Sequence, residues 1–393
     1  METHGTYLDY NATTPVKPAV AARVAEVLAA GGNPSSVHRF GRIARMAVDR
    51  AREQVAELVG ADIEQVVFTS GATEANTLAL RSLAKRAAAE GRACGNVRIL
   101  ISSLEHDSVV GAAWANDLPV EEIPATASGV VDLDALRAML AAGGKVVVAL
   151  MLANNETGVI QPVSEVAALV HAAGGYLHCD AVQGPGRIAI DFDALGADTL
   201  ALSSHKLGGP LGAGAVVAKS AALLSPQLVG GGQERGLRAG TENVPGIAGF
   251  GLAAELVDLQ NAIQIKALRD DLERRVKAIA PAMQFFGATA ERLPNTSCFA
   301  LAGLDAETQV IALDLAGVAI SAGAACSSGK VGVSRVLRSM GASDSLARSS
   351  IRISFGWGST AADIDRFCAA WSALVARRAA RGGNETFRIA AGQ

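Results

Sequence analysis

The sequence predicts an α/β fold with a mostly parallel central sheet, flanking helices and a smaller α+β domain. Short runs rich in Val, Ala and Leu alternate with longer segments in which apolar residues recur at helical spacing. Such alternation is typical of a parallel sheet with helices on both faces. The chain has 393 residues, of which 50% are hydrophobic, so it is long enough to bury a large core and to form two domains.

The elements of the larger domain are expected in alternating order. Helices are predicted, in chain order, over 16–30, 42–59, 73–89, 133–142 and 163–173. Strands are predicted over 66–70, 97–102, 120–123, 145–152, 176–179, 199–203 and 214–218.

The end of the chain is expected to form the smaller unit. A single long charged helix is predicted over 247–280, where acidic and basic residues suit a solvated connecting helix, and 295–393 is expected to be α+β. We therefore predict a large domain over 16–258 and a small domain made from 1–15 and 259–393.

Charge and cysteine usage narrow the class of protein. The net charge is −3 and no long basic run occurs, which argues against binding to nucleic acid or to a membrane surface. No apolar stretch reaches the ~20 residues needed to span a bilayer, and the N-terminus lacks the features of a signal peptide. The five cysteines contain no Cys-x-x-Cys pair, which argues against a zinc site and against disulfides. We therefore expect a soluble cytoplasmic protein.

Polar side chains follow two of the predicted strands. Lys206 ends the run Ser-Ser-His-Lys after one strand, and Asp180 and Gln183 follow another. Because ligands gather at the carboxyl ends of parallel strands, we expect these residues to line one pocket. The aldehyde of pyridoxal phosphate (PLP) requires a lysine amine for a Schiff base, and its pyridine nitrogen requires an acidic partner. The sequence therefore predicts a PLP site.

A phosphate-binding loop is predicted in Thr69-Ser-Gly-Ala-Thr-Glu74, between a strand and a helix. Free N–H groups at a helix start bind anions, and glycine lets a phosphate approach closely. Thr73 adds a hydroxyl, and Ser203 and His205 are further candidates. An ordinary capping turn is the alternative for the loop taken alone. Asp180 and Asn155 likewise have simpler interpretations as a helix cap and a turn, so the joint order of the motifs carries the prediction.

Three further residues suggest substrate chemistry. His106 follows a predicted strand and is suited to stack on a pyridine ring or to relay protons, with a structural or exposed histidine as the alternative. Arg352 is suited to hold a carboxylate through two parallel hydrogen bonds, with a structural salt bridge as the alternative. Cys326 lies in a loop of small and polar residues, a context that favours a reactive thiolate over a core cysteine.

Taken together, these motifs resemble those of cysteine desulfurases of the NifS/IscS type, PLP enzymes of the class-V aminotransferase group. The likeness runs nearly end to end, in matching order, through Tyr7-Leu-Asp-Tyr-Asn-Ala-Thr-Thr-Pro15, Gly32-Asn-Pro-Ser-Ser36, the Thr69–Glu74 loop, Glu105-His106, Asn154-Asn155-Glu156, Asp180 to Gln183, Ser203 to Lys206, Arg235-Gly-Leu-Arg-Ala-Gly-Thr241, the Cys326 loop and Arg352-Ile-Ser-Phe-Gly356. The resemblance implies fold type I of the PLP-dependent transferases, with PLP in the large domain and the catalytic cysteine loop in the small one.

The resemblance also implies a role for each matching residue. Lys206 would form the Schiff base and move the substrate α-proton, His106 would stack on the ring and donate protons, and Cys326 would attack the substrate sulfur. Cofactor contacts are expected from Ala72, Thr73, His106, Asn155, Asp180, Gln183, Ser203, His205, Lys206 and Thr241. Substrate contacts are expected from Asn33, Asn155 and Arg352. Thr241 would reach the phosphate in the neighbouring subunit, which implies a homodimer.

The implied reaction takes sulfur from L-cysteine, releases L-alanine and leaves a persulfide on Cys326. An iron–sulfur scaffold or another acceptor protein would then receive the sulfur. No resident metal is expected, with Cys326 a candidate for transient ligation of an iron–sulfur cluster. The alternatives are a selenocysteine lyase or other C–S lyase, a class-V aminotransferase in which Cys326 is incidental, and a non-enzymatic partner subunit. The nitrogen-fixation and housekeeping subgroups both remain open.

Overall fold

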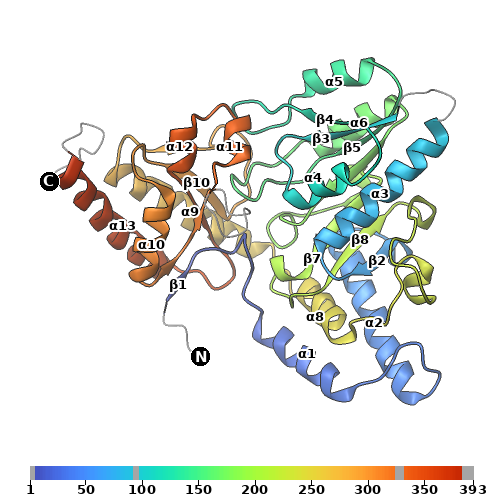
Figure 1. Cartoon of the computed structure of the whole chain (residues 1–393). Coiled ribbons are helices and arrows are strands. Elements are labelled where there is room, and N and C mark those ends of the chain that lie inside the picture. The colour runs from blue at the N-terminus through green and yellow to red at the C-terminus, as the bar shows by residue number, and fades with distance from the viewer. Residues whose placement is uncertain (1–4, 92–96, 324–331, 383–393) are drawn as a thin grey trace.

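The computed structural model describes residues 5–91, 97–323 and 332–382. Figure 1 shows a large-sheet region, residues 18–255, beside a small-sheet region made from residues 5–9 and 260–382. The N-terminal segment lies between the two, because it begins in the small-sheet region and then leads into the first helix of the other.

The central sheet of the large-sheet region has seven strands in the order β2-β8-β7-β6-β5-β3-β4. Their bounds are β2 Val66–Thr69, β3 Val97–Ser102, β4 Val120–Ile123, β5 Lys145–Ala149, β6 Tyr176–Asp180, β7 Thr199–Ser203 and β8 Gly214–Ala218. Strands β4, β3, β5, β6 and β7 are parallel, and β8 runs antiparallel to both of its neighbours. The connection from β7 to β8 is too short for a crossover helix, so β8 must reverse direction. The predicted mostly parallel sheet is confirmed.

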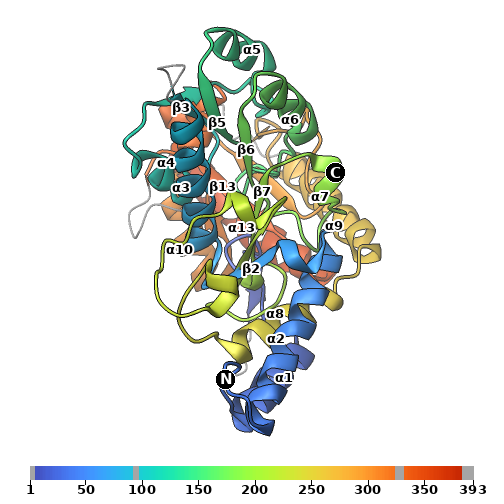
Figure 2. The ribbon, with the colours of Figure 1, turned by 90° about the vertical axis from the view of Figure 1, so that its right-hand side faces the viewer.

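Helices cover both faces of this sheet, as Figure 2 shows. Alternate residues of β5 point to opposite faces, so Val146 and Val148 pack with one set of helices while Val147 and Ala149 pack with the other. The first set comprises α1 Pro18–Ala30, α2 Arg39–Leu58, α5 Leu133–Ala141, α6 Val163–Ala172, α7 Phe192–Leu195 and α8 Val244–Glu255. The second comprises α3 Ala72–Glu90 and α4 Asp107–Trp114.

The small-sheet region is built on a four-stranded antiparallel sheet in the order β12-β13-β10-β9. Its strands are β9 Gln284–Phe285, β10 Thr296–Ala300, β12 Ser321–Ala322 and β13 Ser350–Ser354, and a separate parallel pair joins β1 Thr6–Tyr7 to β11 Val318–Ala319. Its helices are α9 Gln260–Ile279, α10 Ala306–Leu315, α11 Arg335–Ser339, α12 Asp344–Arg348 and α13 Ala361–Gly382.

The two faces of β10 have different partners. Phe299 packs in an aromatic core with Phe367 and Trp371 of α13. Cys298 faces the other way, into a cluster that contains residues of α11 and also Leu104 and Met151 of the large-sheet region. One face of the small sheet therefore stabilises its own region, and the other joins the two regions.

The predicted single helix over 247–280 is wrong. Two helices, α8 and α9, occupy this stretch and are separated at residues 256–259. The Asp258 side chain accepts a hydrogen bond of 2.9 Å from the N–H of Gln260, which helps to start α9 anew. Helix α4 was not predicted, because its apolar residues form too short a pattern. Among the described residues, none of the helices combines the length and the apolar character needed to cross a membrane.

Candidate active site

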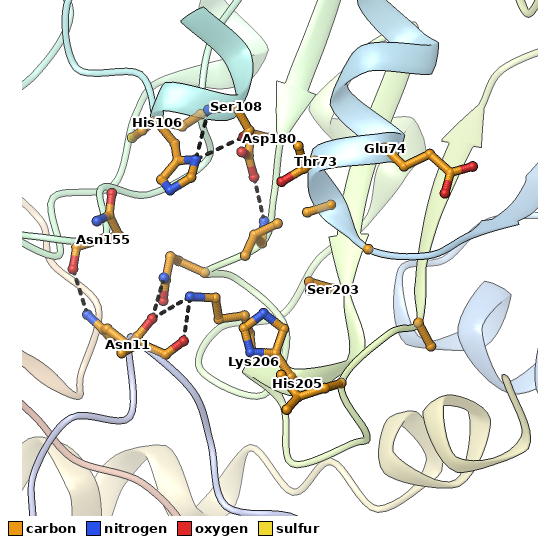
Figure 3. A pocket seen from close by; sticks show the side chains of 18 of the residues that line it. Asn11, Thr73, Glu74, His106, Ser108, Asn155, Asp180, Ser203, His205 and Lys206 are labelled. Atoms are coloured by element: carbon orange, nitrogen blue, oxygen red, sulfur yellow. Dashed lines mark hydrogen bonds between the residues drawn. The ribbon is translucent and has the colours of Figure 1, made fainter. Parts of the chain in front are cut away.

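A cavity of about 490 Å³ opens at the carboxyl ends of strands β5, β6 and β7, where the two regions meet. Its lining brings together most of the predicted site residues, namely Ala72, Thr73, His106, Asn155, Asp180, Gln183, Ser203, His205, Lys206 and Arg352. Figure 3 shows His106 and Asp180 on one side of this pocket, with Lys206 and His205 on the opposite side. The expectation that strand ends converge on one pocket is thus confirmed by the geometry.

Lys206 ends the short 3₁₀ helix η3 (Ser204–Lys206), which directly follows β7. Its Nζ donates hydrogen bonds of 2.6 and 2.9 Å to the carbonyl oxygens of Asn11 and Ala12. The Thr14 hydroxyl donates to the carbonyl of Lys206 at 2.8 Å. The N-terminal segment therefore holds both the backbone and the amine of the lysine (Figure 3).

Asp180 is the last residue of β6 and is buried. Both of its carboxylate oxygens accept hydrogen bonds, Oδ2 from Asn76 Nδ2 at 2.9 Å and Oδ1 from the N–H of Val182 at 3.1 Å. These two donors fix the orientation of the carboxylate. Asp180 is consequently suited to pair with a protonated pyridine nitrogen.

His106 caps the N-terminus of α4 and lines the pocket. Its Nδ1 accepts a hydrogen bond of 3.1 Å from the N–H of Ser108 and lies 2.9 Å from the Ser108 hydroxyl. Because the main-chain N–H can only donate, Nδ1 of the neutral ring carries no proton, and Nε2 carries it instead. His106 thus presents an N–H group at its free edge.

The Thr69–Glu74 loop begins helix α3 at the edge of the pocket. Gly71, the N-cap residue, makes no side-chain cap, so Ala72 and Thr73 present N–H groups that a side chain does not satisfy. Glu74 is directed elsewhere and pairs with Arg238 at 2.9 Å. The loop leaves room for an anion and keeps its one carboxylate occupied.

His205, on the opposite side, is uncharged at neutral pH. Burial, together with the positive charges of Lys206 and Arg187, lowers its pKa to about 4. Its Nδ1 lies 3.1 Å from the hydroxyl of Thr13, so the N-terminal segment fixes this ring as it fixes Lys206. A neutral imidazole is suited to donate a single hydrogen bond to a phosphate.

Arg352, on β13, is a residue of the small-sheet region that lines the pocket. Its guanidinium is almost entirely buried and donates to Asp9 Oδ1 at 2.6 Å and to the carbonyl of Asn155 at 3.0 Å. The structural salt bridge and the pocket position, which were alternatives in the sequence, therefore occur together.

The donor set of the pocket fits PLP. Gln183 Oε1 is buried without a hydrogen-bond partner among the described residues, so a polar group bound here would satisfy it. The start of α3 suits a phosphate, Asp180 suits the ring nitrogen, and Lys206 suits the aldehyde. Among the same described ranges, no group of His, Cys, Asp and Glu side chains is arranged to hold a metal ion.

Two predicted residues within the described ranges are not brought to this pocket. Asn33 and Thr241 are exposed and lie outside its lining. Cys326 lies outside the described residues, which resume at 332. The roles of these three residues stay predictions.

Sequence reasoning also missed three residues that shape the pocket: Asn11, Asn76 and Ser108. Asn11 stands inside a motif on which the resemblance rests, but no role was assigned to it. Asn76 stands at helical spacing with Leu80 and Leu83, and a polar residue on an apolar helix face signals a buried hydrogen-bond partner.

Comparison with known proteins gives consistent matches along the chain. The family model described as "Aminotransferase class-V" matches residues 6–367. A cysteine desulfurase of Cereibacter sphaeroides is 42% identical over 366 residues, which cover 92% of this chain and 93% of that protein. A cysteine desulfurase IscS of Dictyoglomus turgidum is 37% identical, with 91% of each chain covered. The structure of a NifS-like protein from Rickettsia africae ESF-5 superposes with a TM-score of 0.85 at 35% identity and covers 94% of this chain and 99% of that one.

Proposed function

Because this chain belongs to the class-V aminotransferase family, and its relatives over almost the full length are cysteine desulfurases, we propose that the pocket takes the sulfur from L-cysteine. The protein is a PLP-dependent cysteine desulfurase. The observation that carries this conclusion is the convergence of Lys206, Asp180 and His106 on one cavity in a chain with these relatives. A further structural relative, SspA, was solved in complex with cysteine.

Each pocket residue would have a defined task. PLP supplies an electron sink, which stabilises negative charge at the substrate α-carbon once the proton has left. Lys206 would hold the cofactor aldehyde and then take the α-proton, while Asp180 would pair with the ring nitrogen and Gln183 with the ring oxygen. Ala72, Thr73, Ser203 and His205 would hold the phosphate. Arg352 and Asn155 would bind the substrate, with Arg352 pairing to its carboxylate.

Cys326 would complete the reaction. Its thiolate would attack the Sγ of the substrate, so that a sulfur–sulfur bond forms while the carbon–sulfur bond breaks. The electrons of the broken bond stay with the carbon skeleton, which takes up protons and leaves as L-alanine. His106, which presents an N–H to the pocket, would donate a proton in this step. The persulfide on Cys326 would then pass to an iron–sulfur scaffold or another acceptor protein.

A homodimer is also proposed. Large apolar side chains are exposed at the pocket rim and in two loops, with Leu211 of the rim 71% exposed, Val37 between α1 and α2 89% exposed, and Val229, before residue 233, 85% exposed. Surface of this kind supports burial against a second copy. In such a dimer, Thr241 would reach the partner's cofactor phosphate, and Asn33 would be a substrate contact.

We also propose a cytoplasmic location and a division into two domains at 258/259. The break between α8 and α9 supports this domain boundary.

The experiment that tests this function compares sulfide and alanine release from L-cysteine, with a thiol reductant, by wild type and Cys326→Ala. We expect both products from wild type and a loss of at least 100-fold in the variant, because no other described cysteine lines the pocket. The matched control is Cys368→Ala, which removes a buried thiol of α13 whose pKa is raised by burial, and it should keep wild-type turnover.

The remaining outcomes identify the alternatives. Release that survives in Cys326→Ala would indicate a lyase that acts through PLP alone. No release from any of the three proteins, with PLP bound, would point to an aminotransferase.

A further inference from the structure

One buried asparagine links the two groups that would contact the cofactor ring. Asn76 lies on α3 and is fully buried. Its Nδ2 donates to Asp180 Oδ2 at 2.9 Å and to the hydroxyl of Ser108, also at 2.9 Å. Ser108 in turn contacts His106 Nδ1 at 2.9 Å. A continuous chain of hydrogen bonds therefore joins Asp180, through Asn76 and Ser108, to His106.

The orientation of the Asn76 amide follows from its neighbours. An ionised carboxylate accepts hydrogen bonds and donates none, so the amide must turn its nitrogen toward Asp180. Its Oδ1 then faces His178 Nε2 at 2.9 Å, which must carry a proton to donate. His178 Nδ1 lies 2.9 Å from the hydroxyl of Thr199, which completes the shell on the far side. His178 thus locks the amide against rotation.

His178 stays neutral in this position, because burial lowers its pKa to about 4. His178 therefore adds no positive charge beside Asp180 at neutral pH, and the Asn76 amide donates to that carboxylate. On the other arm, the Ser108 hydroxyl accepts from Asn76 and donates to His106, so its hydrogen is directed toward the ring. Every link in the chain has one permitted direction.

We propose that Asn76 is a positioning residue that sets the orientation of Asp180 and, through Ser108, of His106, so that both groups meet the cofactor ring in a fixed relation. This inference rests on the proposed PLP site and deepens it. Asn76 lies outside the lining of the cavity, and the motifs that carry the family resemblance assign it no role. Its effect on the bound ring is exerted entirely through the two side chains that it holds.

The test compares three variants in the PLP-loaded protein. Asn76→Leu removes both arms while it keeps a similar volume, and Ser108→Ala removes only the arm to His106. Ser82→Ala is the matched control, because Ser82 is also buried on α3 and bonds to carbonyls away from the pocket. PLP affinity is measured by equilibrium dialysis, and ring orientation by circular dichroism of the visible PLP band.

We expect Asn76→Leu to weaken PLP binding about tenfold, as for the loss of one hydrogen bond to a charged group. It should also change the visible dichroism. Ser108→Ala should change the dichroism and leave the affinity within about twofold, since the Asp180 arm remains. Ser82→Ala should change neither. Wild-type affinity and dichroism in Asn76→Leu would overturn the proposal, as would the same losses in Ser82→Ala.

Two controls keep the result interpretable. If Asn76→Leu fails to fold, as judged by its far-ultraviolet circular dichroism, Ser108→Ala alone decides, and an unchanged visible band there would refute the coupling to His106. If the wild-type protein itself binds no PLP, the proposed function fails rather than the role of Asn76. Loss of activity with normal PLP affinity and dichroism in Asn76→Leu would also count against positioning.

Discussion

The two regions of the molecule meet at the pocket but contribute to it in different ways. The large-sheet region surrounds the cavity with residues that follow several of its strands, and neighbouring β-strands fix their spacing. The small-sheet region reaches the same cavity through the buried side chain of Arg352. This arginine lies on β13, a strand that also packs against the aromatic core of the small-sheet region. Further contacts between the two regions include those beside the pocket, where Ser334 and Arg335 at the start of α11 meet Glu156 and Glu105.

This difference implies a division of tasks. Groups suited to PLP come from the large-sheet region and the N-terminal segment, and a group suited to a substrate carboxylate comes from the small-sheet region. Changes in the first should therefore affect the cofactor, changes in Arg352 should affect the substrate, and changes at the boundary should affect how the regions hold together.

The largest effect should follow removal of the lysine. Lys206→Ala should abolish the visible PLP band and reduce turnover by more than about 1,000-fold, because it removes both the amine for the aldehyde and the base. Absorbance spectra and alanine release measure the two losses. Lys219→Ala, which changes a lysine at the end of β8, should behave as wild type. The same visible band in Lys206→Ala would disprove the assignment.

An intermediate effect, on substrate binding rather than on the cofactor, should follow a change of Arg352 in the small-sheet region. Arg352→Lys keeps the positive charge but loses the fork that holds Asp9 and Asn155. We expect KM for L-cysteine to rise about 100-fold, with the PLP band retained. Arg366→Lys, an exposed change on α13, is the control. If Arg352→Lys instead released PLP and kept KM, the division between cofactor and substrate sides would be wrong.

The smallest effect should be a pH dependence of the unfolding free energy, caused by Glu105 where the two regions meet. Burial, with a further contribution from Asp180, raises the pKa of Glu105 to about 8. The folded protein therefore holds a proton there that the unfolded chain releases above pH ~4.5, so this group makes stability fall as pH rises from ~4.5 to ~8. Glu105→Gln cannot ionise, and it should lose less stability than wild type between pH 5 and pH 9, by on the order of 2 kcal/mol.

Urea unfolding at the two pH values measures this difference. Glu57→Gln, an exposed change on α2, should lose as much unfolding free energy between pH 5 and pH 9 as wild type. Burial also raises the pKa of Glu156 to about 7, so a wild-type-like slope should partly remain in Glu105→Gln. An identical slope in Glu105→Gln and wild type would show that Glu105 is ionised in the folded protein.

Much of the site could be predicted because its residues end or directly follow strands, and these strands are readable from short apolar runs. Lys206 and Asp180 are examples, since the position of each depends on local sequence and on one rule about parallel sheets. The link from Asn76 to His106 could not be predicted, because it joins residues of different elements whose contacts exist only after packing. The break between α8 and α9 was missed because residues 256–259 contain no glycine or proline that would mark a helix end.

The parallel pairing of β1 with β11 has a consequence for how the protein is made. Residues 6 and 7 are synthesised about 310 residues before their partners at 318 and 319, and Asp9 must wait for Arg352. The large-sheet region can collapse while translation continues, whereas the N-terminal segment that holds Lys206 gains its anchor only after β11 and β13 have been synthesised. A nascent chain truncated before β13 would thus carry the lysine and the carboxylate of the pocket without the arginine that closes it.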